Sequence, residues 1–272
     1  RIPPWFDPTP KQVQATISRQ RWTLYGGAEG GGKTRWLVEI AIRLMLRNSG
    51  IEGIMGRYDY IDVMEPTQVW DVFHRYCPPE LVETEYKSAP PWVRFHNGSR
   101  LTFVGLKDYH PGAEYGFACV DQAEEVPQDT LRLLNGRLRQ RLPNGTFPRF
   151  RMLLTCNPHP NMQWLITEID RHPLAYVFIP ALWSDNPHLP PDFIEQRLKS
   201  YLPRQRRRLL EGLWVAEVEG ALWQADWIEN NRVTDFPELQ RVVVGVDPAI
   251  TSGVESNETG VVVAGLGNDW EY

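Results

Sequence analysis

Residues 27–34 read Gly27-Ala28-Glu29-Gly30-Gly31-Gly32-Lys33-Thr34 and match the pattern GxxxxGK(S/T) at every fixed position. A short apolar run, Trp22–Tyr25, precedes this stretch, and a segment with helical spacing of apolar residues follows it from Lys33 to Asn48. Glycines let backbone N–H groups turn inward around phosphate oxygens, and the amino terminus of a helix adds partial positive charge. The stretch therefore predicts a phosphate-binding loop between a strand and a helix, as in P-loop nucleoside triphosphatases.

The backbone of this loop and its last two side chains are expected to hold ATP and Mg²⁺. Lys33 would reach the terminal phosphates, and the Thr34 hydroxyl would ligate the metal ion. The residues expected to contact the nucleotide are Gly27, Ala28, Glu29, Gly30, Gly31, Gly32, Lys33 and Thr34.

A second acidic site follows the apolar run Phe117–Val120, which reads as a buried strand. Asp121 comes directly after it and would hold Mg²⁺ through the water shell of the ion. Many P-loop enzymes place the catalytic Glu next, but this chain has Gln122, which cannot accept a proton from water. Glu124 or Glu125 would therefore activate the attacking water, and the sequence does not choose between them.

A polar loop follows the next buried strand, Met152–Thr155. Ligands of open α/β sheets lie at the carboxyl ends of strands, where this strand delivers Thr155 and Asn157. Both side chains are expected to sense the γ-phosphate and its loss. The alternative is an ordinary turn made by Asn157-Pro158.

Apolar runs alternate with helical stretches from about residue 20 to 180, which predicts α/β architecture with a mostly parallel, RecA-like sheet flanked by helices. A strand is expected at Gly53–Gly56 and a helix from Pro127 to about Arg141. A β-hairpin is expected from residue 92 to 104. The expected domains are a P-loop ATPase at 1–183, a helical linker or lid at 184–240 and the first strands of an RNase H-like domain at 241–272.

Composition sets looser bounds on function. Hydrophobic residues make up 42% of the 272 residues, charged residues make up 23% and the net charge is −5. A dedicated nucleic-acid binder usually has a basic surplus, but a motor needs only one basic face. Three Cys without a CxxC pair indicate neither disulfides nor zinc and fit an intracellular location, and no apolar run approaches the length of a membrane span.

These pieces, taken in order, resemble the large terminase subunit of tailed bacteriophages, and the resemblance covers nearly the whole chain. Upstream, Gln12 in Pro10-Lys11-Gln12 looks like the adenine-recognising glutamine of that family. The other similar segments are Gly112-Ala113-Glu114-Tyr115, Asp121-Gln122-Ala123-Glu124-Glu125, Thr155-Cys156-Asn157-Pro158, Asp185-Asn186-Pro187, Gly212-Leu213-Trp214 and Val244-Gly245-Val246-Asp247-Pro248-Ala249.

The resemblance implies ATP-driven translocation of double-stranded viral DNA into a procapsid. The family also cuts concatenated DNA, and its partners are a small terminase subunit and the portal ring. It works as a ring of subunits, commonly pentameric, in the cytoplasm of the infected bacterial host and transiently on the procapsid. No membrane partner is implied.

The chain departs from the family where some members carry an arginine in the phosphate loop or shortly before the acidic strand. Here those stretches are Ala28-Glu29-Gly30 and residues 109–112, without arginine. Arg137 and Arg139 are candidates for the missing cation by chemistry, with a solvated helix face as the alternative. The basic run at Arg204–Arg208 could track DNA phosphates, although such runs are more often solvated faces.

A nuclease of this family resembles RNase H and uses two divalent metal ions, Mg²⁺ or Mn²⁺, held by several carboxylates. Asp247 at a strand end would be one ligand, with Glu255 and Glu258 nearby. We interpret the chain as a piece of a longer protein, with the remaining carboxylates beyond Tyr272. This chain is therefore expected not to cleave DNA.

Other functions compatible with a phosphate loop are a helicase, a small-molecule kinase and a nucleotide-binding scaffold. A two-lobe helicase needs a second parallel α/β pattern, and none follows residue 185. A kinase would not need the domain that Asp247 indicates. Gln122 in the usual position of the catalytic Glu is the one observation that favours a scaffold without turnover.

Overall fold

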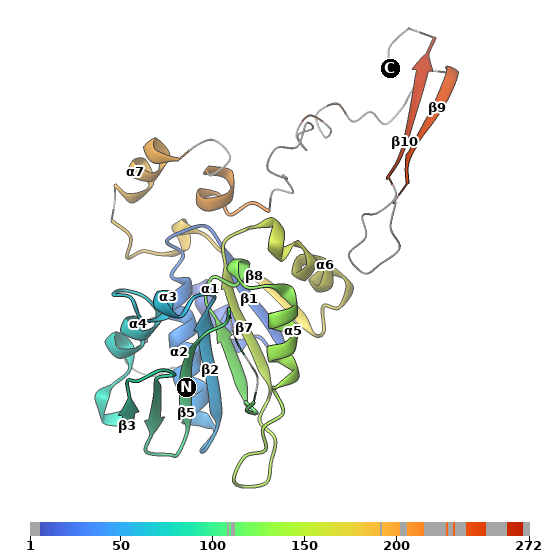
Figure 1. Cartoon of the computed structure of the whole chain (residues 1–272). Coiled ribbons are helices and arrows are strands. Elements are labelled where there is room, and N and C mark those ends of the chain that lie inside the picture. Colours follow the sequence, from blue (N-terminus) through green and yellow to red (C-terminus); the bar gives the residue numbers. More distant parts are fainter. Residues whose placement is uncertain are drawn as a thin grey trace. The chain divides into compact units, whose positions relative to one another are not determined.

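The computed structural model describes residues 6–107, 109, 112–190, 192–201, 206–214, 227, 231, 238–248 and 260–268. The chain divides into two compact units, Arg1–Val218 and Glu219–Tyr272, and each is described here by itself (Figure 1). In the described part, no helix is long and apolar enough to cross a membrane.

The first unit is built on an eight-stranded sheet with the order β3-β4-β5-β2-β6-β7-β1-β8. The strands β5, β2, β6, β7, β1 and β8 run parallel, whereas β3, β4 and β5 pair antiparallel. Their bounds are β1 Trp22–Gly27, β2 Glu52–Arg57, β3 Val82–Tyr86, β4 Trp92–Phe95, β5 Arg100–Gly105, β6 Phe117–Val120, β7 Arg151–Cys156 and β8 Tyr176–Ala181. The predicted mostly parallel α/β sheet is confirmed.

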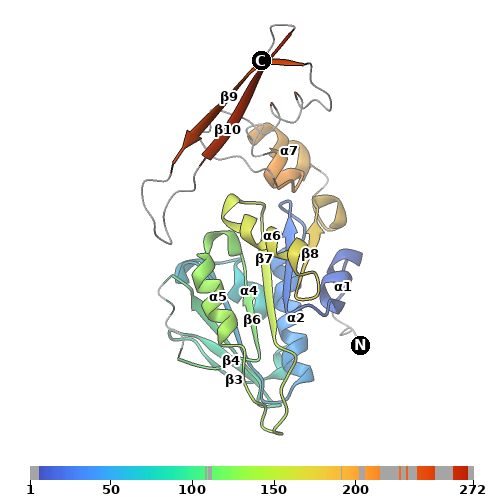
Figure 2. The same ribbon diagram turned by 90° about the vertical axis from the view of Figure 1, so that its right-hand side faces the viewer.

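Helices cover both faces of this sheet (Figures 1 and 2). The helices are α1 Pro10–Ile17, α2 Lys33–Arg47, α3 Tyr60–Met64, α4 Val69–Tyr76, α5 Gln128–Gly136, α6 Gln163–Arg171 and α7 Phe193–Ser200, with short turns η1 Pro79–Leu81, η2 Ala123–Glu125, η3 Pro160–Met162, η4 Trp183–Asp185 and η5 Arg206–Leu210. The core on one face includes α2 and α4, and the core on the other includes α5 and α6. Every residue of β1, β6 and β7 is buried, as expected for central parallel strands covered on both faces.

The helix predicted from Pro127 to about Arg141 is too long at its carboxyl end. It ends at Gly136, and the following residues pair instead with the chain before β6, through a bridge between Leu138 and Tyr115. Glycine is a poor helix former, and the buried backbone groups near Tyr115 need partners. Side-chain periodicity does not report this tertiary pairing.

The second unit contains an antiparallel pair, β9 Leu239–Asp247 and β10 Gly260–Gly267, in which Gly260 is paired with Asp247. Strands were expected within residues 241–272, and β9 and β10 lie there, except that β9 begins two residues earlier. The domain boundaries expected at residues 183 and 240 remain predictions.

Candidate nucleotide and metal site

The strands β2, β6, β7 and β1 are neighbours in the sheet and run parallel, so their carboxyl ends meet at one edge. The glycine-rich loop follows β1, Asp121 follows β6 and Asn157 follows β7. The sheet therefore brings together three segments that lie far apart in the sequence.

The loop needs glycine at both of its ends. Gly27 has φ of 138°, and a Cβ atom there would lie 2.4 Å from the carbonyl oxygen of Ala181. Gly32 has φ of 70° in the left-handed region and is the residue before helix α2. A side chain at either position would strain the backbone, which is why these two positions require glycine.

The Lys33 ammonium group lies inside the loop. It donates to the carbonyl oxygens of Gly27 (3.2 Å) and Ala28 (2.5 Å) and to Oδ1 of Asn157 (2.9 Å). Burial lowers the pKa of Lys33, and the nearby carboxylates of Glu124 and Asp121 act in the opposite direction. This half-buried cation is at the position where phosphate charge would be received.

Thr34 and Asp121 form the candidate metal-binding pair. The Thr34 hydroxyl lies 3.1 Å from each carboxylate oxygen of Asp121, whose side chain is almost completely buried. Thr155 donates a hydrogen bond to Oδ1 of Asp121. A hydroxyl and a carboxylate at one point are the hard oxygen donors that Mg²⁺ takes, so this pair fits the ion.

Asn157 connects Lys33 to Glu124. Its Nδ2 and backbone N–H donate to Oε1 of Glu124 at 2.9 and 3.0 Å, while its Oδ1 accepts from Lys33. The other oxygen of Glu124, Oε2, is buried without a hydrogen-bond partner among the described residues. Burial raises the pKa of Glu124, and the bonds from Asn157 oppose the shift.

Glu125 has different surroundings. Its side chain is 40% exposed, and its carboxylate lies 3.4 Å from Arg57 at the end of β2. Burial raises the pKa of Glu125, and Arg57 lowers it. Gln122 takes a left-handed conformation with φ of 51° at the start of η2. Its backbone N–H donates to Thr155, so Gln122 shapes the turn that carries Glu124.

A cavity of about 320 Å³ adjoins Glu124, and an arginine from a distant segment lines it. The lining residues are Glu124, Glu125, Asn157, Pro158, His159, Asn161, Arg208 and Leu209. Arg208 lies in η5 and helps to lower the pKa of His159, after the larger effect of burial. Sequence reasoning placed Arg208 only in a basic run, because no spacing rule links it to Glu124.

Described residues of the segment 182–214 contact the phosphate loop at several points. Asn186 donates to the carbonyl of Gly30 (2.6 Å), and the backbone N–H of Glu29 donates to the carbonyl of Leu209 (2.7 Å). The carboxylate of Glu29 accepts a hydrogen bond from Tyr201 at 2.6 Å. This segment therefore occupies a backbone N–H of the loop that could otherwise bind phosphate.

Gln12 contacts the same loop through α1. Its Nε2 donates to the carbonyl of Gly32 (3.0 Å), and its Oε1 accepts from the backbone N–H of Thr9 (3.0 Å) in a capping box. The nucleotide role expected for Gln12 stays a prediction, and the capping box gives this residue a structural role that the motif did not reveal.

Arg137 and Arg139 do not join this cluster. Both follow α5 beside Tyr115, at the amino end of β6, and Arg139 pairs with Glu114 at 2.9 Å. Asp121 follows the other end of that strand, and the four residue steps from Phe117 to Asp121 span roughly 13 Å at about 3.3 Å per residue. Asp247 ends β9 in the second unit, and Glu255 and Glu258 lie outside the described residues.

A parallel sheet with a GxxxxGK(S/T) loop facing an acidic strand end defines a P-loop nucleotide-binding domain. Residues 25–230 match the family model described as "Terminase large subunit, T4likevirus-type, N-terminal". The chain therefore belongs to the large terminase family, as its sequence motifs predicted.

Solved structures show the same fold. The large terminase of a thermophilic bacteriophage, solved in complex with ATP-gamma-S, matches with a TM-score of 0.62 and 15% identity over 76% of this chain and 53% of that one. The Thermus phage P74-26 large terminase ATPase domain matches with a TM-score of 0.58 and 16% identity. The match covers 77% of this chain and 95% of that one. The HK97 bacteriophage large terminase matches with a TM-score of 0.59 and 11% identity. The match covers 97% of this chain and 62% of that one.

In another crystal form of the thermophilic phage protein, the match again covers little more than half of that large terminase, 54% of its length. A search of curated protein sequences found no match.

Proposed function

We propose that this chain is the ATP-hydrolysing motor part of a large terminase subunit, which drives double-stranded viral DNA into a procapsid. The observation that carries the proposal is the meeting of Lys33, Thr34, Asp121 and Glu124 at one sheet edge. Membership of the terminase family supports it, as do the relatives solved with ATP-gamma-S and ADP.

The proposed reaction is in-line attack of water on the γ-phosphate. Lys33 would exchange its bonds to backbone carbonyls for phosphate oxygens, while Thr34 and Asp121 would hold Mg²⁺. When bound, the ion would neutralise charge that develops on the phosphates. The backbone N–H groups of the loop, apart from that of Glu29, which donates to the Leu209 carbonyl, would bind the remaining phosphate oxygens. Gln12 would lie beside the nucleotide.

Glu124 is the proposed general base, in preference to Glu125. Asn157 fixes one of its carboxylate oxygens, and the unpartnered oxygen can accept a hydrogen bond from water. The raised pKa of Glu124 brings its basicity closer to the operating pH, which favours proton transfer. Glu125 is paired with Arg57 instead.

Asn157 and Thr155 are the proposed sensors of the γ-phosphate. Asn157 bonds to both Lys33 and Glu124, so movement of Lys33 toward phosphate would change the position of the base. Thr155 bonds to Asp121 and would respond to the metal ion. The contacts of Leu209 and Asn186 with the loop are a route by which such changes would reach the linker.

Arg208 is the proposed source of positive charge for the transition state within the same chain. It lines the cavity beside Glu124 and has no hydrogen bond or ion pair among the described residues. Arg137 and Arg139 lie near the opposite edge of the sheet, so they would serve only the site of a neighbouring subunit. A fixed guanidinium at the γ-phosphate is worth several orders of magnitude in rate.

The proposed partners are double-stranded DNA, the portal ring, the small terminase subunit and further copies of this chain in a ring, with five subunits as the expected number. The site of action would be the cytoplasm of the infected bacterial host, transiently on the procapsid. The full-length protein would also cut concatenated DNA with two divalent metal ions.

The test is steady-state ATP hydrolysis by this chain, with Lys33→Ala as the control and duplex DNA added or withheld. We expect turnover that disappears in Lys33→Ala and increases with DNA. Turnover that DNA leaves unchanged would argue against a packaging motor. Binding of ATP without turnover, even at high protein concentration, would favour the scaffold that Gln122 suggested.

A further inference from the structure

A second pocket lies away from the phosphate loop and is lined largely by arginines. It has a volume of about 450 Å³ and is formed where α1 and α2 end and β7 begins. These points lie at the amino edge of the central strands, opposite the candidate nucleotide site. Its lining residues are Thr16, Ile17, Ser18, Arg19, Arg43, Leu44, Arg47, Asn48, Arg149 and Arg151.

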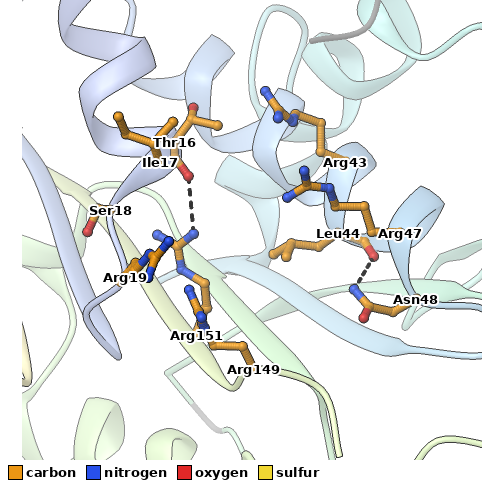
Figure 3. Close-up of a pocket in the computed structure, with 10 residues that line it drawn as sticks. All are labelled: Thr16, Ile17, Ser18, Arg19, Arg43, Leu44, Arg47, Asn48, Arg149 and Arg151. Carbon is orange, nitrogen blue, oxygen red and sulfur yellow. Dashed lines mark hydrogen bonds between the residues drawn. The ribbon is translucent and has the colours of Figure 1, made fainter. Parts of the chain in front are cut away.

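The five arginines come from three segments of the chain and line the same pocket. Figure 3 shows Arg43 and Arg47 of α2 on one wall of the pocket and Arg19, Arg149 and Arg151 on the other. The partial negative charge at the carboxyl end of α2 stabilises the nearby Arg47. It does not account for the three arginines on the opposite wall.

Two of these arginines are buried, and one of them is held by hydrogen bonds. Arg43 and Arg151 are 8% and 5% exposed. The guanidinium of Arg151 donates to the Thr23 hydroxyl (3.0 Å) and the Thr16 carbonyl (3.4 Å), and its Nε is buried without a partner in the described structure. Arg19, Arg47 and Arg149 are exposed and form the rim.

The positive charge of the pocket is poorly compensated. None of its lining residues is acidic, and none of the five arginines forms an ion pair in the described ranges. Burial lowers the pKa of Arg43, and Arg47 lowers it further. Glu39, one turn before Arg43, is the nearest compensating acid on α2, but burial raises its pKa to about 7. Such a concentration of charge in a chain of net charge −5 favours an anionic ligand.

We propose that this pocket binds phosphate groups, either in the backbone of a nucleic acid or as free phosphate or a phosphorylated small molecule. Guanidinium groups donate paired hydrogen bonds to phosphate oxygens, and a terminal phosphate offers three acceptor oxygens and up to two charges. A carboxylate offers two oxygens and one charge, which matches five arginines in one pocket less well. The proposal does not depend on ATP turnover at the other edge of the sheet.

The test replaces two rim arginines and leaves the buried pair intact, so that folding is preserved. The variant is Arg19→Gln with Arg149→Gln, and the matched control is Arg75→Gln with Arg171→Gln, which removes the same charge from exposed positions on α4 and α6. Circular dichroism and thermal unfolding establish that both proteins are folded.

Two probes distinguish the sources of phosphate. The first is a labelled 30-base-pair duplex, with binding measured over a series of salt concentrations. If the backbone enters the pocket, the rim variant binds about tenfold more weakly, and the slope of log K against log salt falls by about 1.8 for two lost phosphate contacts. The second probe is inorganic pyrophosphate, measured by its shift of the unfolding temperature in the variant and in the unaltered chain.

Weaker DNA binding in the rim variant alone, with the control unaffected, supports the pocket and assigns it to nucleic acid. Unchanged DNA binding with a smaller pyrophosphate shift supports it and assigns it to free phosphates. If neither probe distinguishes the rim variant from the control, the proposal is wrong. It is also wrong if poly-glutamate binds the unaltered chain as strongly as DNA does and loses the same affinity in the rim variant.

Discussion

Glu124 and Glu125 are adjacent in the chain but differ in what surrounds their carboxylates. Asn157 holds Glu124 beside Lys33, whereas Arg57 holds Glu125. The buried turn between Asp121 and η2 creates this difference, because the left-handed conformation of Gln122 changes the direction of the chain. Residue types alone left the two acids equivalent.

The first prediction concerns this pair. We expect Glu124→Gln to lower kcat for ATP hydrolysis by about 10²–10⁴, the usual contribution of a general base, with little change in ATP affinity. Glu125→Gln is the matched control and should retain kcat within a few-fold. The reverse order of the two variants would assign the base to Glu125.

Glu39 provides a second prediction at the scale of one residue. It is fully buried in α2, and neither carboxylate oxygen has a hydrogen-bond partner among the described residues. Burial raises its pKa from 4.5 to about 7, against the attraction of Arg35 and Arg43. The folded state therefore binds more protons than the unfolded state between these values, and stability falls as pH rises from about 4.5 to 7.

Glu39→Gln should remove this dependence. The unfolding free energy of the variant minus that of the unaltered chain should increase by roughly 1–3 kcal/mol from pH 5 to pH 8, at 1.36 kcal/mol per pKa unit. Denaturant titrations at both pH values measure this difference, and Glu83→Gln, at an exposed position, is the control. An equal effect of Glu39→Gln at both values would show that Glu39 is ionised throughout.

At the scale of elements, α1 supports the phosphate loop through one side chain. Gln12 caps its own helix and holds the carbonyl of Gly32 at the start of α2. The motif predicted contact with adenine, whereas the observed bonds favour positioning of the loop. The two roles differ in their effect on nucleotide choice.

Gln12→Ala should lower the unfolding free energy by about 1–2 kcal/mol, since a capping interaction is lost. If Gln12 only positions the loop, KM should rise equally for ATP and GTP. If it also recognises adenine, the ratio of kcat/KM for ATP to that for GTP should fall. Gln14→Ala, at an exposed position on the same helix, is the control and should change neither stability nor KM.

The segment after η5 approaches the loop closely at Gly212. This residue has φ of 67°, and a Cβ atom there would lie 2.9 Å from the backbone nitrogen of Ala28. Gly212→Ala should therefore displace the segment from the loop and change the Kd for ATP. The control is Gly145→Ala. Gly145 has a similar φ of 83°, but a Cβ atom there would make only ordinary van der Waals contacts.

Gly145→Ala should lower the melting temperature through backbone strain alone and leave the Kd unchanged. Isothermal titration with a non-hydrolysable ATP analogue measures both variants. Equal Kd values in the two would show that the segment around Gly212 is not coupled to nucleotide binding.

At the scale of the whole molecule, the described strands of the second unit are β9 and β10. Valines on both strands are exposed, including Val243 and Val262. In the described part, no group of three or more acidic, His or Cys side chains could hold a metal ion. A two-metal nuclease needs several carboxylates around its ions.

The sequence-based prediction is that this chain does not nick plasmid DNA in the presence of Mn²⁺. Gel electrophoresis after incubation measures the conversion of supercoiled to open-circular DNA. Nicking that disappears in Asp247→Ala would show that Asp247 belongs to a working metal site in this chain. Nicking that persists in that variant would indicate a contaminating nuclease.

The sequence by itself determined the phosphate loop and the buried strands, because short stretches of sequence predict both. The glycine pattern, Lys33 and Thr34 predicted the phosphate loop, because close packing around phosphate permits few residue types. Buried strands such as β6 and β7 were predicted from apolar runs, and the order of strands and helices predicted a mostly parallel sheet. The family followed from the same ordered motifs.

Tertiary structure alone decided which distant groups meet. The bridge from Lys33 through Asn157 to Glu124, the place of Arg208 in the cavity and the lining of one pocket by five arginines at the opposite edge depend on strand order and chain reversal. Periodicity reports which face of an element is apolar, but it does not report which element covers that face. Contacts between residues more than 100 positions apart therefore required the folded chain.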